Sequence, residues 1–249
     1  MNLKEFFEKY DKVAIAFSGG VDSSYLLDQA KLYAKDVKAY YVKSAFQPTF
    51  ELEDAKKIRD FLSVNMEILD VDVFSEDKIL ENPSDRCYFC KRKIFSTIKR
   101  KALDDGYSIL LDGTNASDEV SDRPGMKAKD ELEVLSPLRM CNLTKDDIRK
   151  LSKERDLFTW NKPSYSCLAT RVKTGDHITR KVLDITERSE NYLKSLGFKD
   201  FRVRNLYGFA KIEIAKDEIN NLLENRKQII KELSRYYNGV LFDLEFRDE

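Results

Sequence analysis

The segment Val13-Ala14-Ile15-Ala16-Phe17-Ser18-Gly19-Gly20-Val21-Asp22-Ser23 decides the fold. Its first five residues form a continuous apolar run, which is typical of a buried parallel strand. A glycine pair follows at once, and apolar residues at helical spacing then continue to about Lys35. A strand that passes through glycines into a helix predicts a phosphate-binding turn. Glycine lets the backbone approach an anion closely, and a helix N-terminus attracts negative charge.

The same alternation of apolar runs and helical patterns continues on the C-terminal side. We expect strands over 13–17, 37–42, 66–71 and 108–111, with helices over 22–35, 51–62 and 90–103. Strands that alternate with helices indicate an α/β fold with a doubly wound, mostly parallel sheet. We assign residues 1–170 to this first domain.

The pattern changes after a long loop, 161–176, that is rich in Pro, Ser, Thr and Gly. We expect a helix over 180–196 ending at Gly197, strands over 201–204 and 209–214, a helix over 219–233 and a strand over 240–246. Residues 176–249 therefore form a small α+β C-terminal domain.

The overall composition is that of a globular protein. Of the 249 residues, 42% are hydrophobic. Lys plus Arg and Asp plus Glu number 44 each, so the net charge is zero and does not favour binding to nucleic acid or to an anionic membrane. No apolar run approaches the roughly 18 residues that span a bilayer, and residues 1–11 do not resemble a signal peptide. We expect a cytoplasmic protein without a membrane partner. Its four cysteines would be ligands, catalysts or core residues rather than disulfides.

Two turns are expected to lie at the same edge of the sheet. The hydroxyls of Ser18 and Ser23 add donors to the first turn, which lacks the Gly-Lys-Ser/Thr ending of the Walker loop, so γ-phosphate transfer is disfavoured. Asp112-Gly113-Thr114-Asn115 follows the fourth expected strand. Ligands of parallel sheets lie beyond the carboxyl ends of the strands, where both turns fall.

Three cysteines form a candidate metal site. Cys87 and Cys90 have metal-ligand spacing, and Cys167 lies in a polar loop much further along. The absence of an obvious fourth ligand disfavours a closed zinc site, although His177 offers one, whereas three thiolates can hold an iron–sulfur cluster with one iron open. Zinc, a redox pair and inert thiols remain alternatives. Cys141 has the surroundings of a bystander thiol.

The first turn resembles the Ser-Gly-Gly-x-Asp-Ser signature of the ATP pyrophosphatase (PP-loop) superfamily, whose fold is HUP-like. Its members use ATP to adenylate a carbonyl or carboxylate and release pyrophosphate. The resemblance implies that Ser18, Gly19, Gly20, Val21, Asp22 and Ser23 bind the phosphates and that Asp22 holds Mg²⁺ and takes part in catalysis. It also implies nucleotide contacts from Ser44, Gly113, Asn115 and Arg123.

Four further motifs, 83–91, 112–118, 123–125 and 162–171, resemble the LarE family of sulfur transferases, and together with the first turn they are distributed over residues 18–171. The resemblance implies adenylation of a carboxylate of a pyridinium biscarboxylate mononucleotide, followed by insertion of sulfur, in nickel-pincer nucleotide biosynthesis. Some members sacrifice the sulfur of a cysteine at the position of Cys167. Others have three cysteines and resemble 4Fe–4S-dependent thiolases. Because Cys87, Cys90 and Cys167 are all present, we favour the cluster type, with sulfide or a sulfur-donor system as a partner.

The resemblance also assigns substrate contacts. Arg171, beside the catalytic Cys167, is a candidate for binding an anionic substrate. Glu190, Arg202, Arg204 and Glu213 match positions that bind phosphate, and Arg202 and Arg204 share one face because they are two apart on a strand. Family members tend to form oligomers, so we expect a homo-oligomer.

Two other functions remain open. A cluster-dependent tRNA thiolase would use the same loop and cysteines, but such a protein usually needs a basic RNA-binding surface, which zero net charge disfavours. A non-catalytic module that only senses ATP or redox state would not need both the complete phosphate turn and the loop around Cys167.

Overall fold

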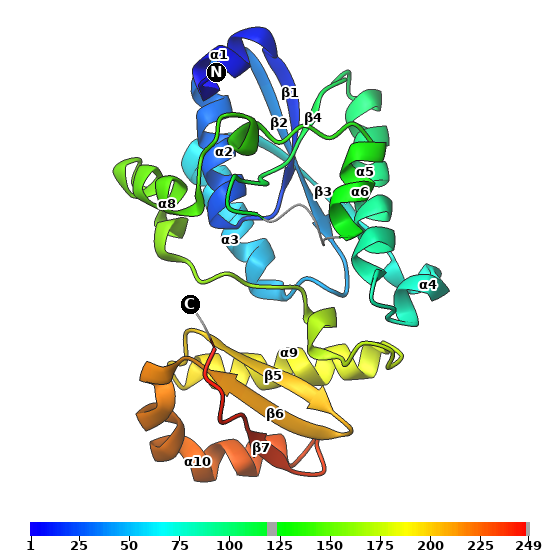
Figure 1. Ribbon diagram of the computed structural model, residues 1–249, viewed down its shortest axis with the longest axis vertical. Coiled ribbons are helices and arrows are strands. Elements are labelled where there is room, and N and C mark those ends of the chain that lie inside the picture. The colour runs from blue at the N-terminus through cyan, green and yellow to red at the C-terminus, as the bar shows by residue number, and fades with distance from the viewer. Residues whose placement is uncertain (119–123, 248–249) are drawn as a thin grey trace. The chain divides into compact units, whose positions relative to one another are not determined.

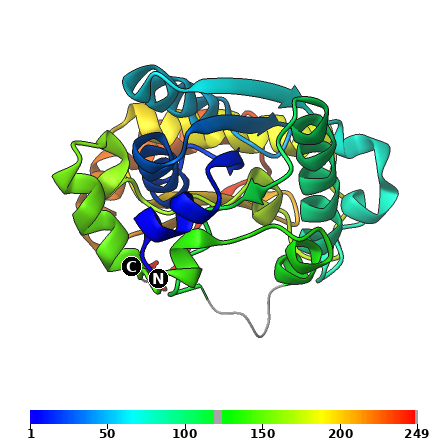
Figure 2. The same ribbon diagram turned by 90° about the horizontal axis from the view of Figure 1, so that it is seen from above.

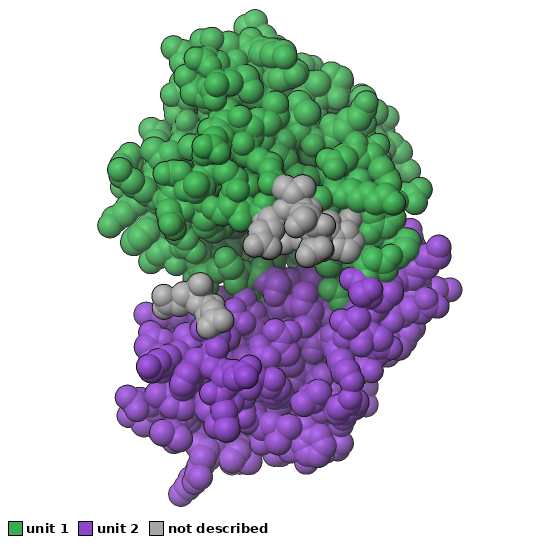
Figure 3. All heavy atoms as spheres, in the orientation of Figure 1, with its two compact units in different colours: residues 1–75, 85–165 green, residues 76–84, 166–249 purple. Residues whose placement is uncertain are grey.

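A computed structural model describes residues 1–118 and 124–247. The chain divides into two compact units (Figure 3). The first unit comprises Met1–Ser75 and Asp85–Tyr165, and the second comprises Glu76–Ser84 and Ser166–Glu249. Residues 76–84 and 166–170, which the sequence analysis assigned to the first domain, group with the second unit because they pack there.

The first unit contains a four-stranded parallel sheet in the order β3-β2-β1-β4. The strands are β1 (Lys12–Phe17), β2 (Asp36–Lys43), β3 (Asn65–Asp70) and β4 (Leu110–Leu111). All four expected strands are present, and β4 is shorter than expected because only two of its residues pair with β1. The predicted parallel α/β architecture is confirmed.

Helices cover both faces of this sheet, as a doubly wound fold requires. Figure 1 shows α2 and α8 on one side and α5 and α6 on the other, and Figure 2 shows the same layers from above. The helices of this unit are α1 (Leu3–Lys9), α2 (Val21–Tyr33), α3 (Thr49–Leu62), α5 (Arg86–Asp104), α6 (Pro124–Glu131), α7 (Pro137–Met140) and α8 (Lys145–Glu154), with 3₁₀ turns η1 (Val73–Ser75) and η2 (Phe158–Asn161).

The core of the first unit forms where the apolar stripes of these helices meet the sheet. Leu26, Leu27 and Ala30 of α2 are fully buried in this core. Helix α1 was not predicted, because it has only seven residues. It forms because Asn2 and Glu5 make a capping box at its start, and because it buries two phenylalanines in the core.

The second unit packs helices against a three-stranded sheet in the order β5-β6-β7, antiparallel then parallel. Its elements are α4 (Asp77–Leu80), η3 (Leu168–Arg171), α9 (Arg180–Ser195), β5 (Phe201–Leu206), β6 (Phe209–Ile214), η4 (Lys216–Glu218), α10 (Ile219–Leu233) and β7 (Val240–Phe242). Gly197 follows the C-cap of α9 with φ +91°, the left-handed conformation that favours glycine. In the described part of the chain, no helix combines the length and apolarity needed to cross a membrane.

Candidate active site

The phosphate turn joins β1 to α2, as predicted. Gly19 has φ +72°, and a Cβ atom there would lie 3.1 Å from backbone atoms of Ala55, so both conformation and space require glycine. Gly20 is the N-cap of α2, and no side chain of the described residues caps this end. The first-turn N–H groups of α2 therefore point out of the helix end, which is the arrangement that binds anions.

Two serine hydroxyls close this turn. The Oγ atoms of Ser18 and Ser23 lie 3.0 Å apart, and the backbone N–H of Ser18 donates to Ser23 Oγ at 3.3 Å. Ser23 Oγ also lies 3.3 Å from the carbonyl oxygen of Gly20, to which it can donate. The hydroxyls thus hold the end of β1 against the first turn of α2 and define the shape of the turn.

The second turn, Asp112–Asn115, lies directly against the first. A Cβ atom at Gly113 would lie 2.9 Å from the backbone nitrogen of Ser23 and 3.1 Å from its Cα. Asn115 Nδ2 donates to Asp22 Oδ1 at 3.3 Å. The structure therefore brings together the two turns that the sequence placed at the carboxyl ends of β1 and β4.

A buried ion pair supports the second turn. Lys129, which is 1% exposed, places Nζ 3.2 Å from Asp112 Oδ2 and donates to Ser136 Oγ at 2.6 Å and Thr114 Oγ1 at 3.0 Å. Ser136 donates to Asp112 Oδ1 at 2.6 Å. Lys129 was not predicted as a site residue, because it stands among charged residues and nothing in the local pattern marks it as buried.

Two further lysines reach the phosphate turn, and the sequence analysis assigned neither to the site. Lys145 Nζ donates to Asp22 Oδ2 at 2.6 Å. Lys162 Nζ lies 2.9 Å from Asp54 and donates to the carbonyl oxygen of Gly19 at 3.3 Å. Both lysines stand at recognisable places in the sequence, because Lys145 follows Thr144, the N-cap of α8, and Lys162 opens a family motif.

Ser44 lies just after β2, the strand next to β1. Its hydroxyl donates to Gln47 Oε1 at 2.6 Å and accepts from the backbone N–H of Phe46 at 3.2 Å, so it closes a local turn. Arg123, the remaining nucleotide contact expected from the sequence, lies outside the described residues.

The cysteines lie in different parts of the fold. Cys87 and Cys90 are the second and fifth residues of α5, three apart and so on one helix face, and Cys87 is exposed. Cys167 is the N-cap of η3 in the second unit. Cys141 packs against the core, and burial raises the pKa of its thiol. Among the described residues, no group of three or more His, Cys, Asp or Glu side chains is arranged to hold a metal ion.

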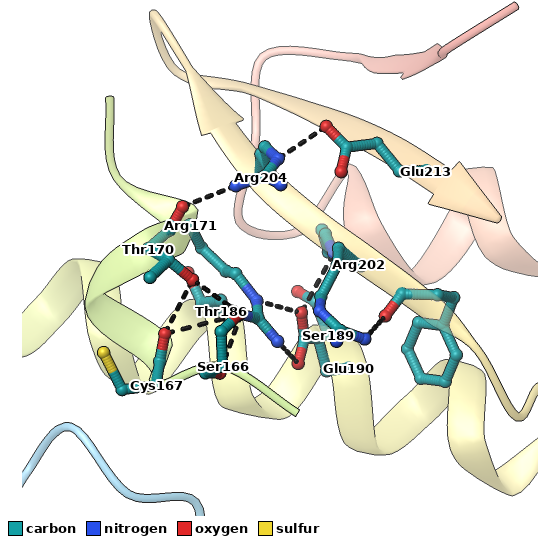
Figure 4. Close-up of polar contacts among 12 residues, drawn as sticks. Ser166, Cys167, Thr170, Arg171, Thr186, Ser189, Glu190, Arg202, Arg204 and Glu213 are labelled. Atoms are coloured by element: carbon teal, nitrogen blue, oxygen red, sulfur yellow. Dashed lines mark hydrogen bonds and ion pairs between the residues drawn. The ribbon is translucent and has the colours of Figure 1, made fainter. Parts of the chain in front are cut away.

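A buried arginine organises the turn that carries Cys167 (Figure 4). Arg171 is 1% exposed, and its Nε and Nη2 donate to the two carboxylate oxygens of Glu190 at 2.7 and 3.2 Å. Its Nη1 donates to the carbonyl oxygen of Ser166 at 2.9 Å and to Thr170 Oγ1 at 2.8 Å. In this arrangement Arg171 holds the backbone around Cys167 in place, with Glu190 as its counter-ion.

The other three candidate substrate residues lie on the neighbouring hairpin of β5 and β6. Arg202 is directly opposite Glu213 in the strand register, and Arg204 forms an ion pair with Glu213 and donates to the carbonyl oxygen of Thr170 at 2.6 Å. Burial, together with the nearby charges of Arg171 and Arg247, lowers the pKa of Arg202 to about 10. Glu190, Arg202, Arg204 and Glu213 therefore belong to one charged cluster beside the Cys167 turn (Figure 4).

Comparison with known proteins places this chain in a family. No family model matches it. It is 33% identical over 225 residues to an uncharacterized protein of Synechocystis sp., which covers 90% of this chain and 84% of that protein. It is 31% identical over 236 residues to the pyridinium-3,5-bisthiocarboxylic acid mononucleotide synthase of Lactiplantibacillus plantarum, which covers 94% of this chain and 86% of that enzyme.

A more distant match points to the wider superfamily. The chain is 28% identical over 188 residues to the tRNA-specific 2-thiouridylase MnmA of Thermotoga petrophila, which covers 57% of this chain and 52% of that enzyme. The match to the Lactiplantibacillus synthase is both higher in identity and nearly complete in coverage. The chain therefore belongs to the LarE family of sulfur transferases, within the PP-loop ATP pyrophosphatase superfamily.

Proposed function

We propose that this protein is an ATP-dependent sulfur transferase that adenylates a carboxylate of a pyridinium biscarboxylate mononucleotide and replaces a carboxylate oxygen with sulfur. One observation carries the proposal. In a LarE-family chain, the phosphate turn and the Asp112–Asn115 turn meet through the contacts of Gly113 and Asp22. The name of the Lactiplantibacillus relative, a bisthiocarboxylic acid mononucleotide synthase, supports the class of acceptor.

The proposed reaction consists of two displacements. A carboxylate oxygen of the acceptor attacks the α-phosphorus of ATP, the bond to the bridging oxygen breaks, and pyrophosphate leaves. The resulting acyl adenylate is a good electrophile, because AMP leaves far more easily than an oxide ion. A sulfide then attacks the carbonyl carbon, the carbon–oxygen bond to AMP breaks, and a thiocarboxylate is released.

Residues of the first unit would serve the first displacement. The backbone N–H groups of the Ser18–Ser23 turn would bind the departing pyrophosphate, and the hydroxyls of Ser18 and Ser23 would add donors. Asp22 lies in the first turn of α2, and its carboxylate oxygens are ligands of the kind that Mg²⁺ prefers. Ser44 and Asn115 follow β2 and β4, the strands that flank β1, and would contact the nucleotide on either side of the phosphate turn.

The cysteines would serve the second displacement. Thiolates are the ligands of iron–sulfur clusters, so the donor set of Cys87, Cys90 and Cys167 fits a 4Fe–4S cluster. When bound, such a cluster would supply the attacking sulfide without loss of a cysteine sulfur. Arg171 would position the Cys167 turn, and the cluster of Glu190, Arg202, Arg204 and Glu213 would bind the substrate phosphate.

Cys167 itself is the alternative source of sulfur. Its thiolate would displace AMP to form a thioester. Loss of the Cα proton and cleavage of the Cβ–S bond would then release the thiocarboxylate and leave dehydroalanine at position 167. A cluster-dependent tRNA thiolase is a second candidate function, favoured by the partial match to MnmA and disfavoured by the zero net charge.

Anaerobic reconstitution tests the proposal. Protein reconstituted with iron and sulfide is incubated with ATP, Mg²⁺, sulfide and the pyridinium biscarboxylate mononucleotide. We expect AMP, pyrophosphate and an acceptor heavier by the exchange of oxygen for sulfur. Formation of ADP and orthophosphate would overturn the adenylating reaction. Protein mass spectrometry separates the sulfur sources, because an intact Cys167 after several turnovers supports the cluster, and dehydroalanine supports sacrifice.

A further inference from the structure

Lys145 contacts the carboxylate to which the proposed function assigns Mg²⁺. Its Nζ donates to Asp22 Oδ2 at 2.6 Å, and the two side chains are 27% and 23% exposed. Asn115 Nδ2 donates to the other oxygen of Asp22 at 3.3 Å. The carboxylate of Asp22 therefore has one charged donor, Lys145, on one oxygen and one neutral donor, Asn115, on the other.

The backbone of Lys145 is fixed, whereas its side chain spans the gap to the phosphate turn. Lys145 is the first residue of α8, and its backbone N–H donates to Ser117 Oγ at 3.0 Å. Thr144 and Asp147 form a capping box at the same helix end. The Nζ atom can therefore move by rotation about side-chain bonds alone, while its origin stays anchored beside the Asp112–Asn115 turn.

The negative charge of Asp22 at the phosphate turn would be compensated differently with and without a bound nucleotide. An unpaired Asp22 would repel a triphosphate, and Mg²⁺ and an ammonium group repel each other on one carboxylate oxygen. With a nucleotide bound at this turn, the phosphate oxygens would be strong acceptors for the released ammonium group of Lys145. We propose that Lys145 and Mg²⁺ exchange at Asp22: Mg²⁺ of the incoming MgATP takes the carboxylate, and Lys145 turns to bind the β- or γ-phosphate.

The exchange rests on the proposed nucleotide site, and it makes two predictions of opposite sign for Lys145→Met. Loss of a charge-assisted hydrogen bond to phosphate weakens binding of the magnesium complex of α,β-methylene-ATP by about tenfold. Binding of Mn²⁺ alone becomes tighter, because the metal no longer displaces an ammonium group. A lysine that only positions Asp22 would instead weaken the binding of Mn²⁺ when it is removed.

Calorimetry measures the binding of the analogue, which cannot be cleaved between its α- and β-phosphates, and electron paramagnetic resonance measures Mn²⁺. The matched control is Lys150→Met, an exposed lysine on the same helix that should leave both affinities unchanged. Circular dichroism confirms that each variant is folded. Unchanged analogue binding in Lys145→Met, or Mn²⁺ binding that is unchanged or weaker, overturns the exchange while the proposed function stands. Failure of the wild-type protein to bind the analogue overturns both.

Discussion

The contact between Gly113 and the phosphate turn gives a sharp test of the site. In Gly113→Ala, the new Cβ would lie 2.9 Å from Ser23 N, 3.1 Å from Ser23 Cα and 3.3 Å from the carbonyl carbon of Asp22. All three are backbone atoms, so relief requires that the start of α2 moves away from the end of β4. Overpacking of this kind costs about 1–3 kcal/mol of unfolding free energy.

The same movement should impair nucleotide binding. Ser23 hydrogen-bonds to Ser18 and lies within bonding distance of Gly20, so displacing it changes the shape of the turn. Loss of a single phosphate hydrogen bond of about 1.5 kcal/mol corresponds to roughly tenfold weaker binding of α,β-methylene-ATP with Mg²⁺. Calorimetry measures the affinity. Urea denaturation, followed by the fluorescence of Trp160, the single tryptophan, measures the stability of the first unit.

Gly106→Ala is the matched control in the same unit. Gly106 has φ +84°, so alanine costs about 1–2 kcal/mol of strain, but its Cβ would meet only the flexible end of Lys12 at 3.6 Å. This variant should lose stability and keep nucleotide affinity. The proposed role of Gly113 in shaping the phosphate turn is refuted if Gly113→Ala binds the analogue as tightly as the wild type, or if both variants lose the same affinity for it.

Three further predictions concern buried charge. Lys129→Met leaves Asp112 buried without its cation and should lower the unfolding free energy of the first unit by about 3–5 kcal/mol, measured by urea denaturation; a loss under 1 kcal/mol would contradict the role of the ion pair. Arg171→Lys removes the bidentate contact with Glu190 and should loosen the Cys167 turn. Iodoacetamide should then alkylate Cys167 faster, and an unchanged rate would contradict the role of Arg171 in positioning this turn. Burial raises the pKa values of Tyr25 and Tyr107 to about 12, so folded protein holds more protons than unfolded protein between pH 10 and 12, and stability should fall across that interval. Tyrosinate absorbance measures this, and ionisation of all twelve tyrosines near pH 10 in folded protein would contradict it.

Local patterns in the sequence were sufficient for most of the fold. The apolar run before Ser18 predicted β1, and the glycine pair predicted the phosphate turn, because strand burial and left-handed backbone are properties of a few adjacent residues. The strand over 209–214 and the helix over 219–233 were predicted with their observed bounds. The seven-residue helix α1 was not predicted, because it depends on the burial of two phenylalanines in a core that the rest of the chain forms.

The contacts that organise the site were decided only by the tertiary structure. Lys145 and Asp22 are 123 residues apart in the chain, and no local pattern relates them. Arg171 and Glu190 were each singled out as binding residues, but only the packing of η3 against α9 shows that they bind each other and fix the Cys167 turn. Side-chain type and spacing identify chemical groups, whereas the partners of a charged group depend on which distant elements the fold brings within hydrogen-bond range. The sequence thus determined the chemistry available to this protein, and the tertiary structure determined which charges are paired in the site.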